Sequence, residues 1–204
     1  MNNSILVWAI APVAFLLGSL PFGAWIVRWR TGEDVRTMGS GNIGATNVLR
    51  TTGKMAGILT LLLDILKGVL AVYLADRWSE GNPAWMSLAA VAVLLGHGFS
   101  PFMNFKGGKA VASFAGAFAY LTPLPLFCVA ILFVLVVWRT KFISMGSIIG
   151  AASFPFAVWL ILHPEWPVAA AALLSGAFIV WRHQSNIERL RAGTENVFRW
   201  GGKK

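Results

Sequence analysis

The sequence predicts an all-α integral membrane protein with seven transmembrane helices, an N-terminus outside and a cytoplasmic C-terminus. Apolar residues make up 57% of the 204 positions and charged residues only 12%, a balance typical of membrane proteins rather than soluble domains. Basic residues gather in alternate connections between the apolar segments, as the positive-inside rule requires. With no low-complexity linker in sight, residues 1–204 are interpreted as a single polytopic domain.

The predicted helices follow apolar stretches near residues 5–27, 55–75, 84–103, 110–122, 124–138, 142–162 and 166–181. A crossing needs about 20 residues, with roughly 17 tolerated, so the stretches 110–122 and 124–138 are short. The first stretch is interpreted as a retained helix rather than a signal peptide, because "MNNS" carries no positive charge. Cys128 lies in an apolar run and is expected to be a small core residue.

The net charge of +9 follows the predicted topology rather than a nucleic-acid surface. With the N-terminus outside, only Arg77 falls in an outside connection, and Lys67 falls within the second segment. The cytoplasmic connections and tail then hold Arg28, Arg30, Arg36, Arg50, Lys54, Lys106, Lys109, Arg139, Lys141, Arg182, Arg189, Arg191, Arg199, Lys203 and Lys204.

Two crossings must share residues 110–138, which allows each helix at most about 22 Å against roughly 30 Å of hydrocarbon. We therefore expect "NFKGGK" to dip into the inner leaflet, with Pro123 and Pro125 at the outer turn. Irregular backbone at that depth requires a polar cavity or burial in protein, so short or re-entrant helices should surround a pocket on the cytoplasmic side. The alternative is six crossings with one long helix here, which would break the charge pattern.

The first polar motif is "GSGNIGATNVLR", residues 39–50, between the first two apolar segments. Gly39 and Gly41 allow backbone N–H groups to converge on an anion, and a helix starting near Thr46 would add its positive end. Arg50 supplies a planar charged fork suited to phosphate. The neutral donors are Ser40, Asn42 and Asn47. A flexible inter-helix loop is the alternative interpretation.

The second motif, residues 96–116, contains "KGGK". Lys106 and Lys109 place two ammonium groups around Gly107 and Gly108, whose backbone permits close approach of an anion, and Lys109 would open the next helix. His97 lies upstream in an apolar helix. It either supports this site or is a hydrogen-bonded structural residue.

The third motif is "RHQSNIERLRAGTEN", residues 182–196, where the last helix leaves the membrane. His183 and Asn186 share a helix face, and Glu195 follows a glycine and can fold back. His183 and Glu188 point about 140° apart on a helix, so they do not form a His–acid catalytic pair.

Further polar residues lie inside apolar segments. Asp64 and Lys67 are spaced to pair on one helix face, with substrate contact as the alternative. Ser144 and Ser147 are either helix-interface hydroxyls or part of the pocket. Neither a metal-ligand spacing nor a Ser-His-Asp nucleophile set is present in the sequence, which therefore predicts no metal site and no cofactor.

The three motifs combine cations, glycines and neutral donors with few bases, a composition suited to phosphate compounds. Short helices would open such a pocket sideways to lipid. We therefore expect one substrate with an acyl tail and one soluble phosphate. A membrane transporter or exchanger of phosphate esters is the alternative function.

The chain resembles the bacterial acyl-phosphate:glycerol-3-phosphate acyltransferase family (PlsY). The matching segments are "GSLPFG", "GSGNIGATNVLR", "LDILKG", "GHGFSPFMNFKGGKAVA" and "HQSNIERLRAGTE". The resemblance implies a seven-helix enzyme of the bacterial cytoplasmic (inner) membrane, with its active site facing the cytoplasm. It also implies transfer of a fatty acyl group from acyl-phosphate to glycerol 3-phosphate, giving lysophosphatidate and inorganic phosphate, the first step of phospholipid synthesis.

Acyl-phosphate, glycerol 3-phosphate and membrane lipid are thus the expected partners, and nucleic acid is not. Residues and resemblance together predict a catalytic set of Ser40, Arg50, Lys109, His183 and Asn186. The predicted substrate-binding set is Gly39, Gly41, Asn42, Thr46, Asn47, Lys106, Gly107, Gly108, His97, Ser144, Ser147 and Glu195. The family's mechanism implies that the substrate itself assists the transfer, which agrees with the scarcity of bases.

Overall fold

The computed structural model describes residues 3–198, which form α-helices, two short 3-10 helices and no strand. The first half contains α1 (Asn3–Ser19), α2 (Phe22–Thr31), η1 (Val35–Thr37), α3 (Ala45–Thr52), α4 (Lys54–Ser79) and α5 (Pro83–Gly98). The second half contains η2 (Pro101–Met103), α6 (Val111–Leu121), α7 (Pro123–Thr140), α8 (Ile143–Leu162), α9 (Trp166–Arg182) and α10 (Gln184–Arg191).

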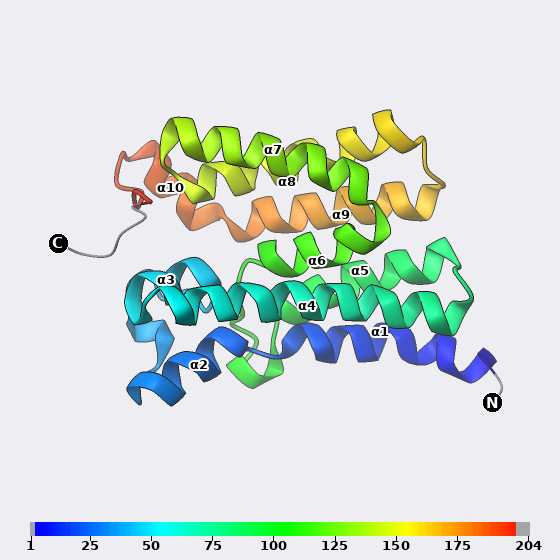
Figure 1. The fold of residues 1–204 in the computed structure, drawn as a ribbon, viewed down its shortest axis with the longest axis horizontal. Helices are drawn as coiled ribbons and strands as arrows, with labels where there is room; N and C mark the ends of the chain where they lie inside the picture. The colour runs from blue at the N-terminus through cyan, green and yellow to red at the C-terminus, as the bar shows by residue number, and fades with distance from the viewer. Residues whose placement is uncertain (1–2, 199–204) are drawn as a thin grey trace.

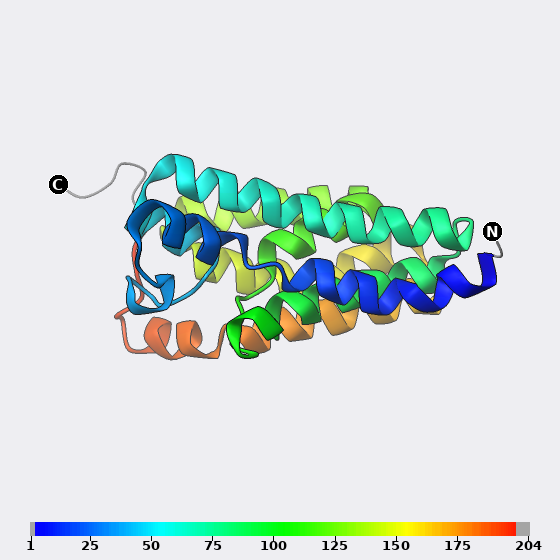
Figure 2. The same ribbon diagram turned by 90° about the horizontal axis from the view of Figure 1, so that it is seen from below.

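The long helices lie side by side along one axis, and from α4 to α9 successive helices run in opposite directions (Figures 1 and 2). The short helices α2, α3 and α10 gather at one end of the bundle, on the left of Figure 1. We call this the basic end. The basic residues of its helix termini and connections are Arg28, Arg30, Arg36, Arg50, Lys54, Arg139, Lys141, Arg182, Arg189 and Arg191.

Five segments are long and apolar enough to cross a membrane, and α6 and α9 are shorter apolar helices. The predicted shortness of 110–122 is confirmed by α6, which has 11 residues. The expectation of a short 124–138 helix is wrong, because α7 starts directly at Pro123 and continues for 18 residues to Thr140. Cys128 lies exposed on α7 rather than in the core.

Glycines allow the helix backbones to touch. A Cβ at Gly18 of α1 would overlap the carbonyl oxygen of Val93 on α5, and one at Gly116 of α6 would overlap that of Ile65 on α4. The facing helices carry reciprocal glycines, Gly96 and Gly68. Such close approach is how apolar helices gain contact in lipid, where no hydrophobic force drives them together.

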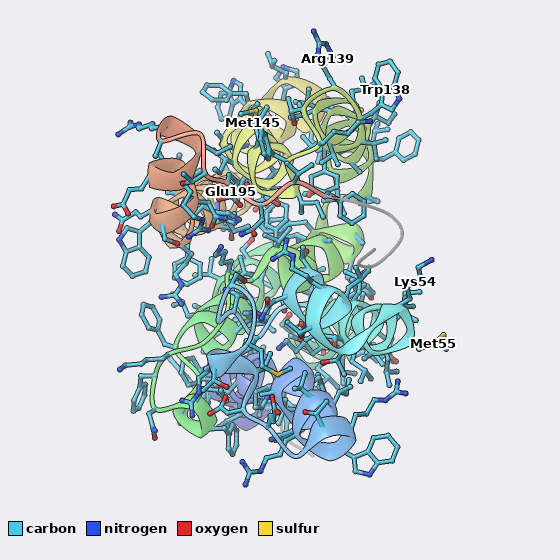
Figure 3. All side chains as sticks on the ribbon, turned by 90° about the vertical axis from the view of Figure 1, so that its left-hand side faces the viewer. Lys54, Met55, Trp138, Arg139, Met145 and Glu195 are labelled. Carbon is cyan, nitrogen blue, oxygen red and sulfur yellow. The ribbon has the colours of Figure 1, made fainter. Side chains whose placement is uncertain are left out.

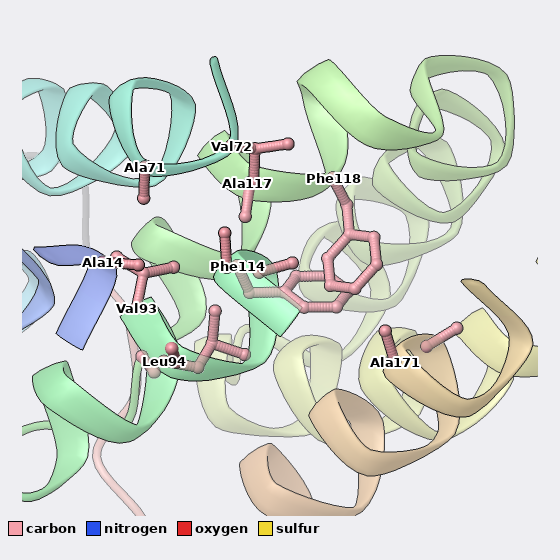
Figure 4. Close-up of a cluster of buried hydrophobic side chains, with 14 of the residues drawn as sticks. Ala14, Ala71, Val72, Val93, Leu94, Phe114, Ala117, Phe118 and Ala171 are labelled. Carbon is pink, nitrogen blue, oxygen red and sulfur yellow. The ribbon is translucent and has the colours of Figure 1, made fainter. Parts of the chain in front are cut away.

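The core joins the two halves of the chain. Phe114 and Phe118 of α6 lie with their ring centroids 4.7 Å from that of Phe154 on α8. Figure 4 shows these α6 rings between Leu94 of α5 and Ala171 of α9. The short helix α6 is therefore held on several sides.

The first apolar segment was expected to form one helix, but it forms two. The break lies between Ser19 and Phe22 at Pro21, which has no N–H to donate. The carbonyl oxygens left open at the break are satisfied by other elements. Ser100 Oγ donates to Ser19 O at 2.5 Å, and Lys67 Nζ donates to Leu20 O at 3.0 Å. Within a membrane such partners are required, because no water reaches the open carbonyls.

The predicted pairing of Asp64 with Lys67 is confirmed: Lys67 Nζ lies 2.8 Å from Asp64 Oδ1, and both side chains are buried. The ring Nδ1 of His97 lies 3.1 Å from Ser113 Oγ and 3.8 Å from Asp64 Oδ1. This polar cluster connects the break in the first segment to the end of α5, where the second motif begins.

Candidate functional site

Asn47 organises the first motif from within. Its Oδ1 accepts from the backbone N–H of Ser40 at 2.9 Å, and its Nδ2 donates to the carbonyls of Met38 at 3.0 Å and Asn42 at 2.9 Å. The side chain is only 2% exposed. Gly39 has φ 56°, and a Cβ there would overlap Asn47 Oδ1. Asn47 was predicted to contact substrate; in the structure these hydrogen bonds use its amide to shape the loop.

The other groups of this motif are partly used by the loop and partly free. Asn42 Oδ1 accepts from Gly44 N at 2.8 Å and so fixes the approach to α3. Gly41, at φ 70°, makes the turn that a side chain would strain. Within residues 3–198 the side chains of Ser40, Thr46 and Arg50 form no hydrogen bond or ion pair, and Ser40 and Arg50 are exposed. They remain available to a ligand.

The KGGK loop is seated on the end of α5. Gly107 N donates to Gly98 O at 3.0 Å, and Gly108 N donates to His97 O at 3.1 Å. A Cβ at Gly108 would overlap the His97 ring, and one at Gly107 would overlap the His97 carbonyl oxygen. These glycines permit close packing against α5, and their N–H groups already have partners.

Arg182, the last residue of α9, holds the other side of the same loop. Its Nε donates to Gly108 O at 3.1 Å and its Nη2 donates to Gly107 O at 2.8 Å. From the sequence, Arg182 counted only among the cytoplasmic charges. The sequence signal that could have identified Arg182 as a site residue is its position beside His183 at the end of a helix.

Lys109 connects the second motif to the third. Its Nζ donates to Asn186 Oδ1, and Asn186 Nδ2 donates to Glu195 Oε1 at 2.9 Å. Glu195 folds back as predicted: it accepts from Ser144 Oγ at 3.1 Å and pairs with Arg189 Nε at 2.8 Å. Figure 3, which faces the basic end, places Glu195 inward of Arg139 at the rim. The second and third motifs therefore share one network.

Lys109, a residue of the second motif, also interacts electrostatically with charged residues of the first and third motifs. Burial lowers the pKa of its ammonium group to about 8, and the positive charge of Arg189 contributes to the lowering while Glu195 opposes it. Arg182 and Arg50 act in the same direction as Arg189. Since like charges gathered without enough acids repel, this cluster favours binding of an anion.

His183 sits at the junction of α9 and α10 and is 3% exposed. Its ring Nδ1 lies 2.7 Å from Ile179 O, and because a carbonyl only accepts, the proton belongs on Nδ1 and the lone pair on Nε2. Burial lowers the pKa of the ring to about 4, although the bond to Ile179 O opposes the shift. His183 is therefore a neutral ring at physiological pH.

A cleft at the basic end brings the motifs together. Its lining residues are Asn42, Lys109, Trp181, Arg182, Gln184 and Ser185. An apolar groove between α5 and α9 includes Leu94, Leu174 and Phe178, and it shares Trp181 with the cleft. The polar cleft and the apolar groove thus meet at one side chain, that of Trp181.

Some predicted residues lie outside this cleft. Ser147 donates its hydroxyl to Ile143 O of its own helix at 3.0 Å. Lys106 is exposed beside the loop, and His97 lies beneath it. Within residues 3–198 there is no group of three or more His, Cys, Asp or Glu side chains that could hold a metal ion.

Residues 8–193 match the family model described as glycerol-3-phosphate acyltransferase. The chain is 45% identical over 183 residues to glycerol-3-phosphate acyltransferase 1 of Deinococcus radiodurans, covering 90% of this chain and 91% of the relative. It is 42% identical over 199 residues to the glycerol-3-phosphate acyltransferase of Geobacter sulfurreducens, covering 98% of this chain and all of the relative (100%).

Two crystal structures of PlsY (YgiH), an integral membrane glycerol 3-phosphate acyltransferase, are similar to the whole fold. The glycerol 3-phosphate form aligns with TM-score 0.89 and 34% identity, covering 95% of this chain and 96% of that one. The lysophosphatidic acid form aligns with TM-score 0.86 and 32% identity, covering 95% of both chains.

Proposed function

Since this chain belongs to the glycerol-3-phosphate acyltransferase family and transfers an acyl group to glycerol 3-phosphate, we propose that its acyl donor is an acyl-phosphate. The observation that carries this proposal is the cationic cleft that meets an apolar groove at Trp181. Two phosphates, one on each substrate, need the several cations around Lys109 if they are to lie side by side. The groove offers the acyl tail an apolar surface.

The scarcity of strong bases supports the same donor. An acyl-phosphate is a mixed anhydride with phosphate as a good leaving group, so the reaction needs little acid catalysis. His183 is a weak base, with a ring pKa lowered to about 4 by burial. A site with these groups suits positioning of reactants rather than activation of a protein nucleophile.

In the proposed reaction, Ser40, Arg50 and Lys109 hold the two phosphates so that the glycerol hydroxyl faces the carbonyl carbon. The bond from that carbon to the hydroxyl oxygen forms, and the bond to the phosphate oxygen breaks. The hydroxyl proton leaves on the departing phosphate or on Nε2 of His183. The products are lysophosphatidate and inorganic phosphate.

Asn186, Glu195 and Ser144 have a supporting role in this proposal, because their hydrogen bonds fix the position of Lys109. Thr46, Asn42 and the first-motif loop complete the phosphate side of the cleft. Asn47 and the glycines of both motifs act by shaping those loops.

We further propose that residues 1–204 form one domain with seven crossings in a bacterial cytoplasmic membrane. The basic end would face the cytoplasm and α1 would begin outside. The alternation of charge supports this orientation, since Arg77 lies near the opposite end of the bundle. The connection from α5 to α6 turns back before it reaches the basic end, as a dipping loop would (Figure 1).

The donor is tested with purified protein, glycerol 3-phosphate and either a long-chain acyl-phosphate or the matching acyl-CoA. We expect phosphate release and lysophosphatidate with the acyl-phosphate and none with the thioester. Turnover with the thioester alone would refute the proposed donor. Proteoliposomes that take up labelled glycerol 3-phosphate without any donor would instead favour the transporter alternative.

A further inference from the structure

Arg182, at the end of α9, forms hydrogen bonds with the KGGK loop. Its guanidinium group donates to two consecutive carbonyls, Gly108 O from Nε and Gly107 O from Nη2. The same group lies 5.7 Å from the ring centroid of Phe99 and 5.6 Å from that of Trp181. A planar fork held by two aromatic rings is rigid, and lysine cannot reproduce it.

The loop is thus fixed from two sides. The N–H groups of Gly107 and Gly108 donate to α5, while their carbonyls accept from Arg182 at the end of α9. The next residue, Lys109, donates to Asn186 on α10, the helix that follows Arg182 in the chain. Every backbone hydrogen-bonding group of the two glycines has a partner, so the direction in which Lys109 leaves the loop is set.

We propose that Arg182 is a positioning residue, which holds the Gly107–Gly108 carbonyls so that Lys109 projects into the cleft. The inference rests on the proposed function of the cleft as the site of acyl transfer. It assigns the essential property of Arg182 to the geometry of its fork rather than to its charge.

The fork and the charge make different predictions for substitution. Arg182→Lys keeps a cation that can still attract phosphate but loses the paired donors and the stacking. If geometry matters, kcat should fall at least about tenfold, because the variant loses a charge-assisted hydrogen bond to the loop that holds Lys109. If charge alone matters, turnover should stay near that of the wild type.

Chemical rescue provides the decisive readout. Arg182→Ala removes the fork and leaves space at the wall of the cleft, into which propylguanidinium added from solution can bind. We expect propylguanidinium to restore turnover of Arg182→Ala, and propylammonium, which has the charge without the fork, to fail. Rescue is not expected of a variant that has merely lost its fold.

The matched control is Arg191→Ala, which removes an exposed arginine of α10 that forms no hydrogen bond or ion pair within the described residues. It should keep wild-type turnover and show no response to propylguanidinium. Unfolding temperatures of all variants, measured in detergent, show which of them fold.

Three results would overturn the proposal: a near wild-type Arg182→Lys enzyme, equal rescue by both cations, or no rescue of a folded Arg182→Ala protein. If Arg182→Ala does not fold, the turnover of Arg182→Lys decides. Wild-type protein in the same assay separates this proposal from the proposed function. A wild type inactive with acyl-phosphate refutes the donor, whereas an active wild type with an equally active Arg182→Lys refutes only the role of Arg182.

Discussion

At the scale of single residues, Lys109 gives the activity a pH dependence. Its ammonium group has a pKa lowered to about 8, mainly by burial, so the cation is present below pH 8 and is lost as the pH rises through that value. We predict that kcat/KM for glycerol 3-phosphate falls above about pH 8, because a neutral amine cannot hold phosphate.

The control for this prediction is the Lys109→Arg variant, whose guanidinium group stays charged at high pH. Its profile should remain flat beyond the point where the wild type declines, even if its activity is lower. Coincident profiles for the two proteins would show that another group titrates. The measurement is initial-rate kinetics across the neutral and alkaline range in the same detergent.

His183 tests whether the protein or the substrate takes the proton. An asparagine can keep the hydrogen bond to Ile179 O that the ring now donates from Nδ1. We predict that His183→Asn lowers kcat by less than about tenfold, because a general base contributes roughly 10²–10⁴ and a ring with a pKa near 4 is a poor one. A loss of about a thousandfold in a folded His183→Asn protein would instead identify His183 as the base.

The residue scale also shows what the sequence could not reveal. Ser40, Asn47 and Arg50 belong to one polar motif, and the sequence shows each of them only as a possible hydrogen-bond donor to a ligand. Only the hydrogen bonds distinguish Asn47, whose amide is used by the loop itself, from the free side chains of Ser40 and Arg50. Donor types can be read from a sequence, but their existing partners cannot.

At the scale of elements, the close packing of α6 on α4 makes a stability prediction. Gly116→Ala places a methyl group against the carbonyl oxygen of Ile65, so the backbones must separate. We predict a loss of about 1–3 kcal/mol in the free energy of unfolding and a lower unfolding temperature, as in other overpacked interiors.

The control is Ala119→Val on the same helix, where the side chain is exposed and a larger group has room. Thermal unfolding of both variants in detergent makes the comparison. Equal unfolding temperatures for Gly116→Ala and Ala119→Val would contradict the close packing of α6 on α4.

The apolar runs predicted the positions of the long helices and the short α6, and the first polar motif predicted the helix that starts near Thr46. The break at Pro21 was not, because its open carbonyls are satisfied by Ser100 and Lys67, residues distant in sequence. The turn between α9 and α10 at His183 was not predicted for a similar reason. Helix periodicity alone does not show where a chain turns to reach Lys109.

At the scale of the whole molecule, the orientation remains a prediction from charge. In a background that replaces the exposed Cys128, a single cysteine can be placed by Glu33→Cys near the basic end or by Glu165→Cys at the opposite end, both at exposed positions. An impermeant maleimide added to intact cells should label the Glu165→Cys variant directly and the Glu33→Cys variant only after the membrane is opened. The reverse pattern would invert the topology.

The proposed reaction moves the acyl group from one phosphate compound to another within the cationic cleft. Its most direct test follows two phosphates in one reaction, with different labels on the acyl-phosphate and on glycerol 3-phosphate. We predict that the donor's label appears only as inorganic phosphate, and that the acceptor's label appears in lysophosphatidate in equal amount. Donor label in the lipid, or phosphate release without lipid formation, would contradict this reaction.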